Sequence, residues 1–135
     1  MAGNYGANQY KTTSIKTATP GQLLIMLYES AIKSVKLATE CMEKKDIAGK
    51  GKHICKVHDI INELTNTLNF EAGGNIAEDL ERLYTFMSSQ LLKGNLENSK
   101  ECLQTVQKLL ETLLSGWKVA VTEAQKSQGN ANAKV

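Results

Sequence analysis

The chain has little of what marks membrane-spanning or secreted proteins. Its 135 residues contain one proline, and aromatic residues make up only 5% of them. The longest run of large apolar residues is Leu23–Tyr28, whereas a membrane-spanning helix needs about 20. The opening MAGNYGANQYK has no apolar core of the kind found in a secretory signal. We therefore expect a cytoplasmic protein without membrane insertion.

The chain also has few cysteines and a small net charge. Cys41, Cys55 and Cys102 are isolated and show no C-x-x-C spacing, which favours buried thiols in a reducing cytoplasm over a disulfide framework or zinc site. The formal net charge of +2 is too small to indicate a nucleic-acid partner. The lysines from Lys44 to Lys56 have no interleaved aromatic residues, so we expect a solvated face there.

The sequence is rich instead in residues with helical periodicity. A first helix is predicted from Thr19, which can act as N-cap before Pro20, with Gln22 completing a capping box. We expect this helix to end near Lys44 and a basic connection to follow at 46–52. The second helix then carries one apolar stripe: Ile47, Ile54, Val57, Ile61, Leu64 and Leu68.

The second half of the chain repeats this pattern. Gly73-Gly74 is expected to interrupt the helix, with Asn75 and Glu78 capping the third helix. The stripe of the third helix is Ile76, Leu80, Leu83, Tyr84, Met87 and Leu91. A turn is expected at 93–95, and the stripe of the fourth helix is Leu96, Leu103, Val106, Leu110, Leu113 and Trp117.

Four long periodic segments joined by short connections predict an all-α fold, an antiparallel four-helix bundle. We expect a flexible N-terminal arm at 1–18, the bundle at 19–126 and a disordered tail at 127–135.

The first helix has more apolar residues than one core face needs. Its core-facing set on a helical wheel is Leu24, Leu27, Tyr28, Ala31, Val35, Ala38 and Met42. Leu23, Met26, Leu37 and Cys41 fall on a different side. Either the arm folds back and covers them, or they form a hydrophobic surface for a partner, and the two explanations are compatible.

Catalytic and metal sites find little support in the sequence. A di-iron bundle needs Glu-x-x-His pairs, and neither His53 nor His58 has Glu three residues before it, so we expect no metal and no cofactor. His53 with Lys56 resembles a histidine phosphotransfer site, although Val57 replaces the glycine of that pattern. This phosphotransfer domain is the alternative function. Trp117 is either a core anchor or a partner-binding residue. Nothing else indicates an enzyme.

Two blocks of sequence resemble the FliS family of flagellar secretion chaperones. The first runs from Tyr10 through the A-T-P cap at 18–20 to the L-L-I-M-L-Y segment at 23–28. The second is L-N-F-E-A-G-G-N-I-A at 68–77, followed by Leu83-Tyr84 and Met87. Trp117 also matches, so the resemblance extends from Tyr10 to Trp117.

The resemblance implies a cytoplasmic four-helix bundle that binds the C-terminal region of newly made flagellin. Such a chaperone prevents premature polymerisation and keeps flagellin competent for type III export, meeting the flagellar export apparatus as a chaperone–client complex. As a hypothesis, the arm around Tyr10 shields part of an apolar groove until the client displaces it. The candidate partner-binding residues are Tyr10, Ile15, Leu23, Met26, Leu37, Ile60, Leu109 and Leu114.

Overall fold

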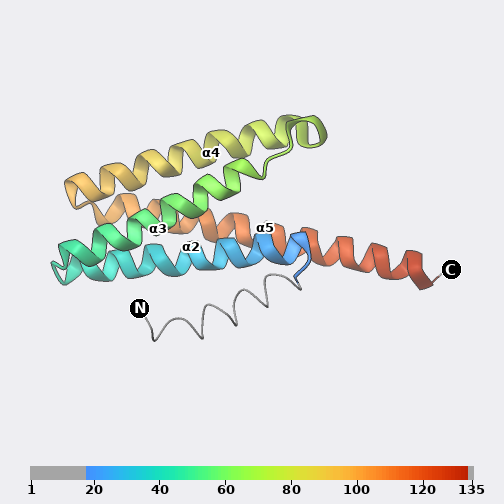
Figure 1. Cartoon of the computed structure of the whole chain (residues 1–135), viewed down its shortest axis with the longest axis horizontal. Coiled ribbons are helices and arrows are strands. Elements are labelled where there is room, and N and C mark those ends of the chain that lie inside the picture. Colours follow the sequence, from blue (N-terminus) through green and yellow to red (C-terminus); the bar gives the residue numbers. More distant parts are fainter. Residues whose placement is uncertain (1–17, 134–135) are drawn as a thin grey trace.

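The computed structural model describes residues 18–133, with side chains described to residue 127. This part of the chain forms four helices and no strand: α2 (Pro20–Glu43), α3 (Ile47–Asn66), α4 (Phe70–Glu97) and α5 (Lys100–Ala133). Successive helices run in opposite directions (Figure 1). The helix α2 packs against α3 and α5, and α4 closes the bundle against the same two helices. The predicted all-α four-helix bundle is confirmed.

The core lies where the four apolar stripes meet. Its fully buried members include Tyr28 and Val35 of α2, Val57 and Leu64 of α3, Met87 and Leu91 of α4, and Leu103, Val106 and Leu110 of α5. The wheel prediction for α2 is confirmed: Tyr28, Ala31, Val35 and Ala38 are buried, and Leu24, Leu27 and Met42 pack against the cluster. Burial of each large side chain contributes about 1.5–3 kcal/mol.

The start of α2 is set by its predicted capping box. The Gln22 backbone N–H donates to Thr19 Oγ1 at 3.2 Å, and the Thr19 N–H donates to Gln22 Oε1 at 2.9 Å. Pro20 occupies the first helical turn, where a backbone N–H has no acceptor within the helix, so the lack of an N–H in proline costs no hydrogen bond. The helix ends at Glu43 with Lys44 as C-cap, as predicted.

The basic connection predicted at 46–52 is wrong, because α3 already begins at Ile47. Asp46 is its N-cap, and the Asp46 carboxylate accepts from the Gly49 N–H at 3.0 Å. Ile47 is 77% exposed and does not extend the apolar stripe. Lys50 is instead only 5% exposed, and its Nζ donates to the Asn95 carbonyl at 3.0 Å and to Asn98 Oδ1.

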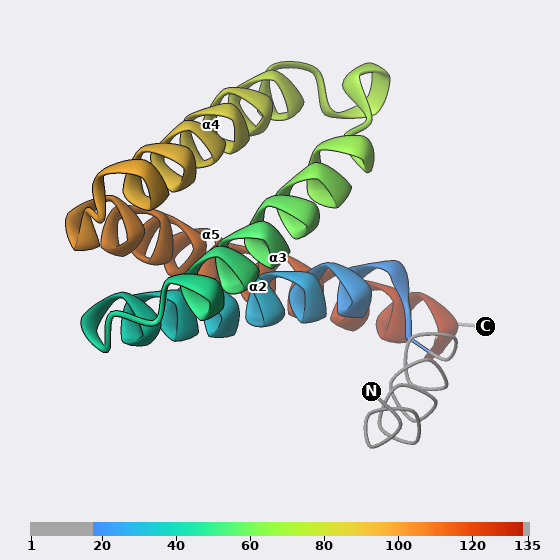
Figure 2. The same ribbon diagram turned by 60° about the vertical axis from the view of Figure 1, so that its left-hand side comes forward.

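The start of α4 also differs from the prediction. Asn69 caps the helix by accepting from the Ala72 N–H at 3.0 Å, and one helical turn precedes the glycine pair. Gly74 then leaves the helix with φ 50° and ψ −122°, which produces a kink, visible at the upper right of Figure 2. Gly74 therefore interrupts the helix where expected, but α4 already begins at Phe70, before the glycine pair. Ile76, assigned to the buried stripe, is 68% exposed.

The turn between α4 and α5 lies four residues later than the predicted turn at 93–95. Gly94 is a buried helical residue where a Cβ would come within 3.1 Å of Leu103, so this glycine permits close packing instead of a turn. The chain turns at Asn98, which adopts the left-handed conformation with φ 51°. Leu96 consequently belongs to α4 and is 74% exposed.

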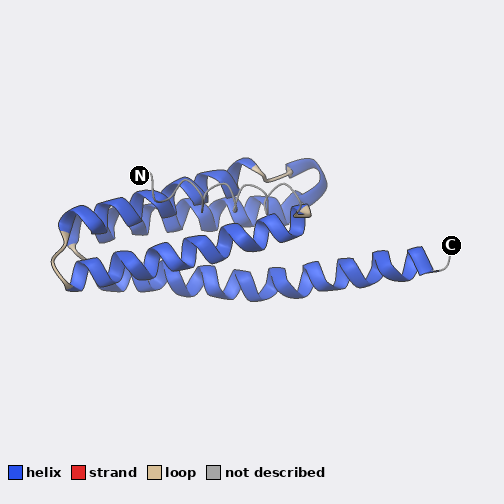
Figure 3. Ribbon diagram, turned by 60° about the horizontal axis from the view of Figure 1, so that its bottom comes forward, coloured by secondary structure: helices blue, strands red, loops and turns tan. Residues whose placement is uncertain are grey.

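The helix α5 is longer than expected. It continues to Ala133, beyond the other helices, as Figure 3 shows, whereas a disordered tail was expected from residue 127. Ala124, Gln125 and Lys126 are good helix formers, and extending an established helix is far easier than starting one. Residues 134–135 and the arm up to residue 17 lie outside the described residues.

The three cysteines occupy different environments. Cys102 is buried and Cys41 half-buried, but Cys55 is exposed, so the expectation of buried thiols is wrong for Cys55. Within residues 18–133, none of the helices combines the length and apolar character required to cross a membrane.

Candidate functional site

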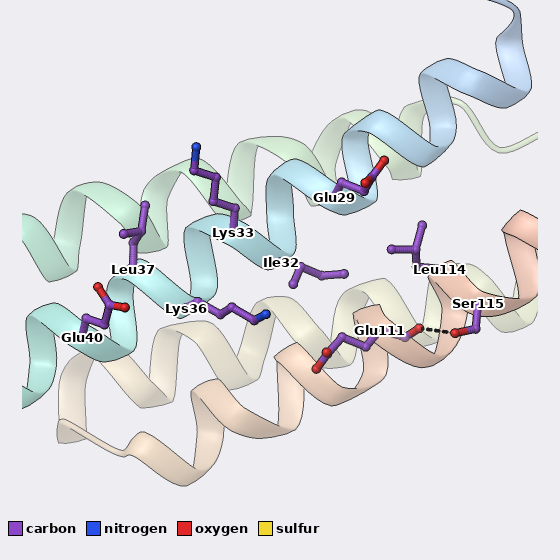
Figure 4. Close-up of a pocket in the computed structure, with 9 residues that line it drawn as sticks. All are labelled: Glu29, Ile32, Lys33, Lys36, Leu37, Glu40, Glu111, Leu114 and Ser115. Carbon is purple, nitrogen blue, oxygen red and sulfur yellow. Dashed lines mark hydrogen bonds between the residues drawn. The ribbon is translucent and has the colours of Figure 1, made fainter.

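A surface groove runs between α2 and α5 and has a volume of about 550 Å³. We call it the α2–α5 groove. It is lined by Glu29, Ile32, Lys33, Lys36, Leu37, Glu40, Glu111, Leu114 and Ser115. Figure 4 shows the side chains of Ile32 and Leu114 approaching each other from the two helices, with Leu37 farther along α2 beside Glu40. Ile32 and Leu114 form the apolar floor between the two helices, and Leu37 adds an apolar side chain farther along the lining.

The rim of the groove carries both signs of charge. Glu29, Lys33, Lys36 and Glu40 follow one another at three- and four-residue steps, so they share one face of α2. Glu111 lies on α5, and its backbone carbonyl accepts from Ser115 Oγ at 3.2 Å (Figure 4). None of these five charged side chains joins an ion pair among the described residues. The Glu111 carboxylate accepts instead from Gln107 Nε2 at 3.2 Å.

Of the predicted partner-binding residues that the structure describes, two come together. Leu37 and Leu114 both line the α2–α5 groove. Leu23 and Met26 are half-buried and lie outside the core packing, but they line neither the groove nor the pocket described below. Leu109 is half-buried and packs against the core.

Ile60 was predicted to bind a partner, but it is a core residue with 8% exposure and lines neither the groove nor the pocket described below. It falls outside the narrow stripe of α3, but α3 packs between α2 and α4 and is therefore buried over a wider face than the stripe predicts. Tyr10 and Ile15 lie outside the described residues.

A second pocket, of about 340 Å³, lies at the end of the bundle where α3 connects to α4. We call it the end pocket. Helices α2, α4 and α5 and the α3–α4 connection contribute to its lining: Leu24, Thr67, Leu68, Asn69, Ala72, Gly73, Ile76, Ala77, Leu80, Tyr84 and Trp117. Figures 1 and 2 show α3 and α4 diverging from α2 and α5 toward this end. The pocket was not predicted from the sequence, in which Leu68 and Ile76 were assigned to the apolar stripes of the second and third helices.

Three polar aromatic groups meet beside the end pocket. The hydroxyls of Tyr28 and Tyr84 form a buried hydrogen bond of 2.5 Å. Burial raises the pKa of Tyr28, while the bond to Tyr84 and the neighbouring Trp117 indole act in the opposite direction. Burial raises the pKa of Tyr84 strongly, and its bond to Tyr28 raises it further. Both hydroxyls therefore stay protonated in the folded protein at neutral pH.

Trp117 differs from the two tyrosines because its polar atom lacks a partner. Its Nε1 is buried and has no hydrogen-bond acceptor among the described residues. The indole is close enough to Tyr28 to lower that pKa, yet it makes no hydrogen bond with suitable geometry to the hydroxyl. The ring otherwise packs against the core, in line with the predicted core anchor.

The histidine proposed for phosphotransfer and the possible metal-binding side chains do not form a site together. His53 is half-buried on α3. Across residues 18–133, no three His, Cys, Asp or Glu side chains are grouped so that they could hold a metal ion.

The fold and its two recesses define a helical bundle with apolar surface sites. Residues 2–124 match the model of the family described as flagellar protein FliS. The chain therefore belongs to the FliS family.

Curated relatives agree with this assignment. The flagellar secretion chaperone FliS of Bacillus subtilis is 30% identical over 119 residues, covering 88% of each chain. That of Salmonella typhimurium is 35% identical over 107 residues, covering 78% of this chain and 79% of the relative. These relatives are named as chaperones, and neither name denotes an enzyme.

A solved structure supports the fold. The chain titled "Crystal structure of flagellar chaperone from bacteria" superposes with a TM-score of 0.73, covering 87% of this chain and 96% of that chain, at 20% identity. At this identity the likeness concerns the fold alone.

Proposed function

We propose that the protein is a non-enzymatic, cytoplasmic export chaperone that binds the C-terminal segment of flagellin. It prevents premature polymerisation and keeps flagellin competent for type III export, and the complex then meets the flagellar export apparatus. Family membership and the names of the relatives support the export role. The observation that carries the client-binding role is the α2–α5 groove, with its apolar floor and charged rim.

The groove suits a segment that is disordered before it binds. Fixing the backbone of such a segment costs about 1–2 kcal/mol per residue, whereas burying a large apolar side chain contributes about 1.5–3 kcal/mol. A net free energy of about −8 kcal/mol, equivalent to micromolar affinity, therefore needs many apolar contacts. Leu37 and Leu114 supply some of them, and the half-buried Leu23 and Met26 extend the apolar surface of α2.

Isothermal titration of the full chain with a synthetic peptide of the flagellin C-terminal segment tests the proposal. We expect saturable binding in the micromolar range or tighter, and a scrambled peptide of equal composition serves as the control. Absence of binding at tens of micromolar would refute the proposal.

The contribution of the groove is tested by the pair Leu37→Gln and Leu114→Gln. If each leucine loses about 1 kcal/mol of apolar contact with the client, the double variant binds about 30-fold more weakly. Leu92→Gln is the matched control, because Leu92 is an exposed leucine of α4 that lines neither recess. If Leu92→Gln weakened binding as much as the double variant does, the client would not bind in the α2–α5 groove.

The N-terminal arm completes the proposed mechanism. In the free protein the segment around Tyr10 shields part of the apolar surface, and the client displaces or remodels it. Client affinity and association rate are compared for wild type, for Tyr10→Ala and for a chain lacking residues 1–16. A shielding arm slows association in the wild type relative to the shortened chain. Unchanged affinity and kinetics in both variants would exclude a role for the arm.

A further inference from the structure

The end pocket is bordered by a short helical turn that is set apart from the rest of α4. This turn, residues 70–73, follows Asn69, whose backbone is extended. It ends at Gly74, where φ 50° and ψ −122° break the helix. Figure 2 shows the turn at the upper right, separated from the long part of α4. We call residues 69–73 the lid segment, and the backbone leaves the helical conformation at both of its ends.

The lid segment is held together by hydrogen bonds of its own. The Ala72 N–H donates to Asn69 Oδ1 at 3.0 Å, and the Gly73 N–H donates to the Asn69 carbonyl at 2.7 Å. Among the described residues, no side chain of the segment forms a hydrogen bond or an ion pair with another helix. The segment can therefore turn as a unit without breaking these bonds. Gly74 suits the role of a hinge, because glycine adopts positive and negative φ about equally and the space around this residue is open.

The lid segment directs its small residues to the pocket and its large apolar residue to solvent. Asn69, Ala72 and Gly73 line the end pocket, whereas Phe70 does not and is 45% exposed. The lining contains no charged side chain, and the volume of about 340 Å³ can accommodate an aromatic ring. Transfer of a ring from water to an apolar lining is favourable. An exposed phenylalanine thus lies on a hinged turn at the edge of a pocket that suits it.

We propose that the lid segment closes the end pocket with its own aromatic side chain. The segment turns about Asn69 and Gly74, and the Phe70 ring enters the pocket and lies against Trp117. The structure shows the open form, and the closed form is present for about half of the time or more, because closure removes the ring from water. No bound partner is needed, so the closure is independent of the proposed function.

The closed form regulates access to the pocket. An apolar group that enters the end pocket must compete with the Phe70 ring for the same space. Its apparent affinity is the intrinsic affinity multiplied by the open fraction, so a pocket open for about half of the time binds about twofold more weakly than one that is always open. The lid is therefore an autoinhibitory contact within the chain.

The two phenylalanines of the chain provide a direct test. Phe70 and Phe86 are 45% and 44% exposed in the open form, and Phe86 lines neither recess. The full chain labelled with 4-fluorophenylalanine gives one fluorine signal for each ring, and Phe86→Leu assigns them. A soluble gadolinium chelate broadens the signals of exposed rings. We expect about twofold less broadening for Phe70 than for Phe86, since the lid protects Phe70 for about half of the time. Equal broadening would overturn the inference.

The position of the protected ring is tested in the same sample. Closure brings the Phe70 ring to Trp117, the sole tryptophan, so we expect a nuclear Overhauser contact between the Phe70 fluorine and the indole ring protons. Phe86 should show no such contact. A Phe70 fluorine without this contact would overturn the inference, even if the ring were protected.

Truncation of the ring supplies the complementary measurement. Phe70→Ala should leave the pocket open, and acrylamide should then quench the Trp117 fluorescence about twofold more efficiently than in the wild type. Phe86→Ala is the matched control and should leave the quenching unchanged, with the helical content of both variants checked by circular dichroism. Equal quenching in Phe70→Ala and the wild type would overturn the inference.

Discussion

The buried pair of Tyr28 and Tyr84 allows a prediction in which changing both residues destabilises the protein no more than changing one. Each hydroxyl is the other's hydrogen-bond partner, at 2.5 Å, in residues that are 0% and 2% exposed. Changing one tyrosine to phenylalanine leaves the other hydroxyl buried without that partner, which costs about 1–3 kcal/mol. Changing both removes the two polar groups together and leaves a similar apolar shape.

We therefore expect Tyr28→Phe and Tyr84→Phe each to lower the free energy of unfolding by about 1–2 kcal/mol. The double variant should lose no more than either single variant, which corresponds to a coupling energy of about 1 kcal/mol or more. Urea denaturation followed by helical circular dichroism measures all four proteins. Losses that simply add would show that the two hydroxyls do not depend on each other.

The same pair predicts the response to alkaline pH. Burial raises the pKa of both tyrosines in the folded state, whereas in the unfolded chain it is about 10. Above that pH the unfolded chain releases protons that the folded protein retains, so the free energy of unfolding decreases. The decrease approaches about 1.4 kcal/mol per pH unit for each tyrosine, and below pH 10 the stabilisation is fully present. The double phenylalanine variant should show a shallower decrease; an identical pH dependence would refute this account.

Three further predictions concern other parts of the bundle. Lys50→Met removes both hydrogen bonds of the buried ammonium and should lower the free energy of unfolding by about 1–3 kcal/mol in urea, whereas Lys52→Met, at an exposed lysine, should change it by less than about 0.5 kcal/mol. Gly74→Ala imposes a side chain at φ 50° and should cost about 1–3 kcal/mol, while Gly51→Ala, at a helical glycine with open space around it, should stabilise the protein by up to about 1 kcal/mol. An acid-labile phosphate on His53 after incubation with a phosphorylated response regulator would favour the phosphotransfer alternative, and the chaperone proposal expects none.

The features predicted best from the sequence depend on neighbours along the chain. The Thr19 capping box joins residues three positions apart, and the start of α2 was therefore readable from a short stretch. The apolar stripes likewise follow from helical periodicity, and most of their members are buried. Helix identity and the core of α2 were consequently predictable.

The features predicted poorly depend on contacts between distant residues. Lys50 is buried because its Nζ reaches Asn95 and Asn98, which are 45 and 48 residues away in sequence. Gly94 resembles a turn residue, but it serves the close approach of Leu103 from the next helix. No local pattern distinguishes these roles from those of a solvated lysine or a helix-ending glycine.

The candidate site was only partly predictable for the same reason. Leu37 and Leu114 were chosen because they fall outside the apolar stripes, and the groove joins them. Ile60 met the same criterion but is buried, since its exposure is decided by the helices on either side. The end pocket is assembled from α2, α4, α5 and the α3–α4 connection, which are far apart in the sequence, so no local pattern predicts it.

The length of α5 has a practical consequence for experiments on this protein. A Cβ added to Gly21, in the first turn of α2, would come within 2.9 Å of Val121, so α5 passes the end of α2 near that residue. The helix continues for twelve residues to Ala133, a rise of about 18 Å. Exposed positions on this overhang, such as Glu123 and Lys126, line neither the groove nor the end pocket. A dye, a surface tether or a fused reporter placed there leaves both recesses open to a client.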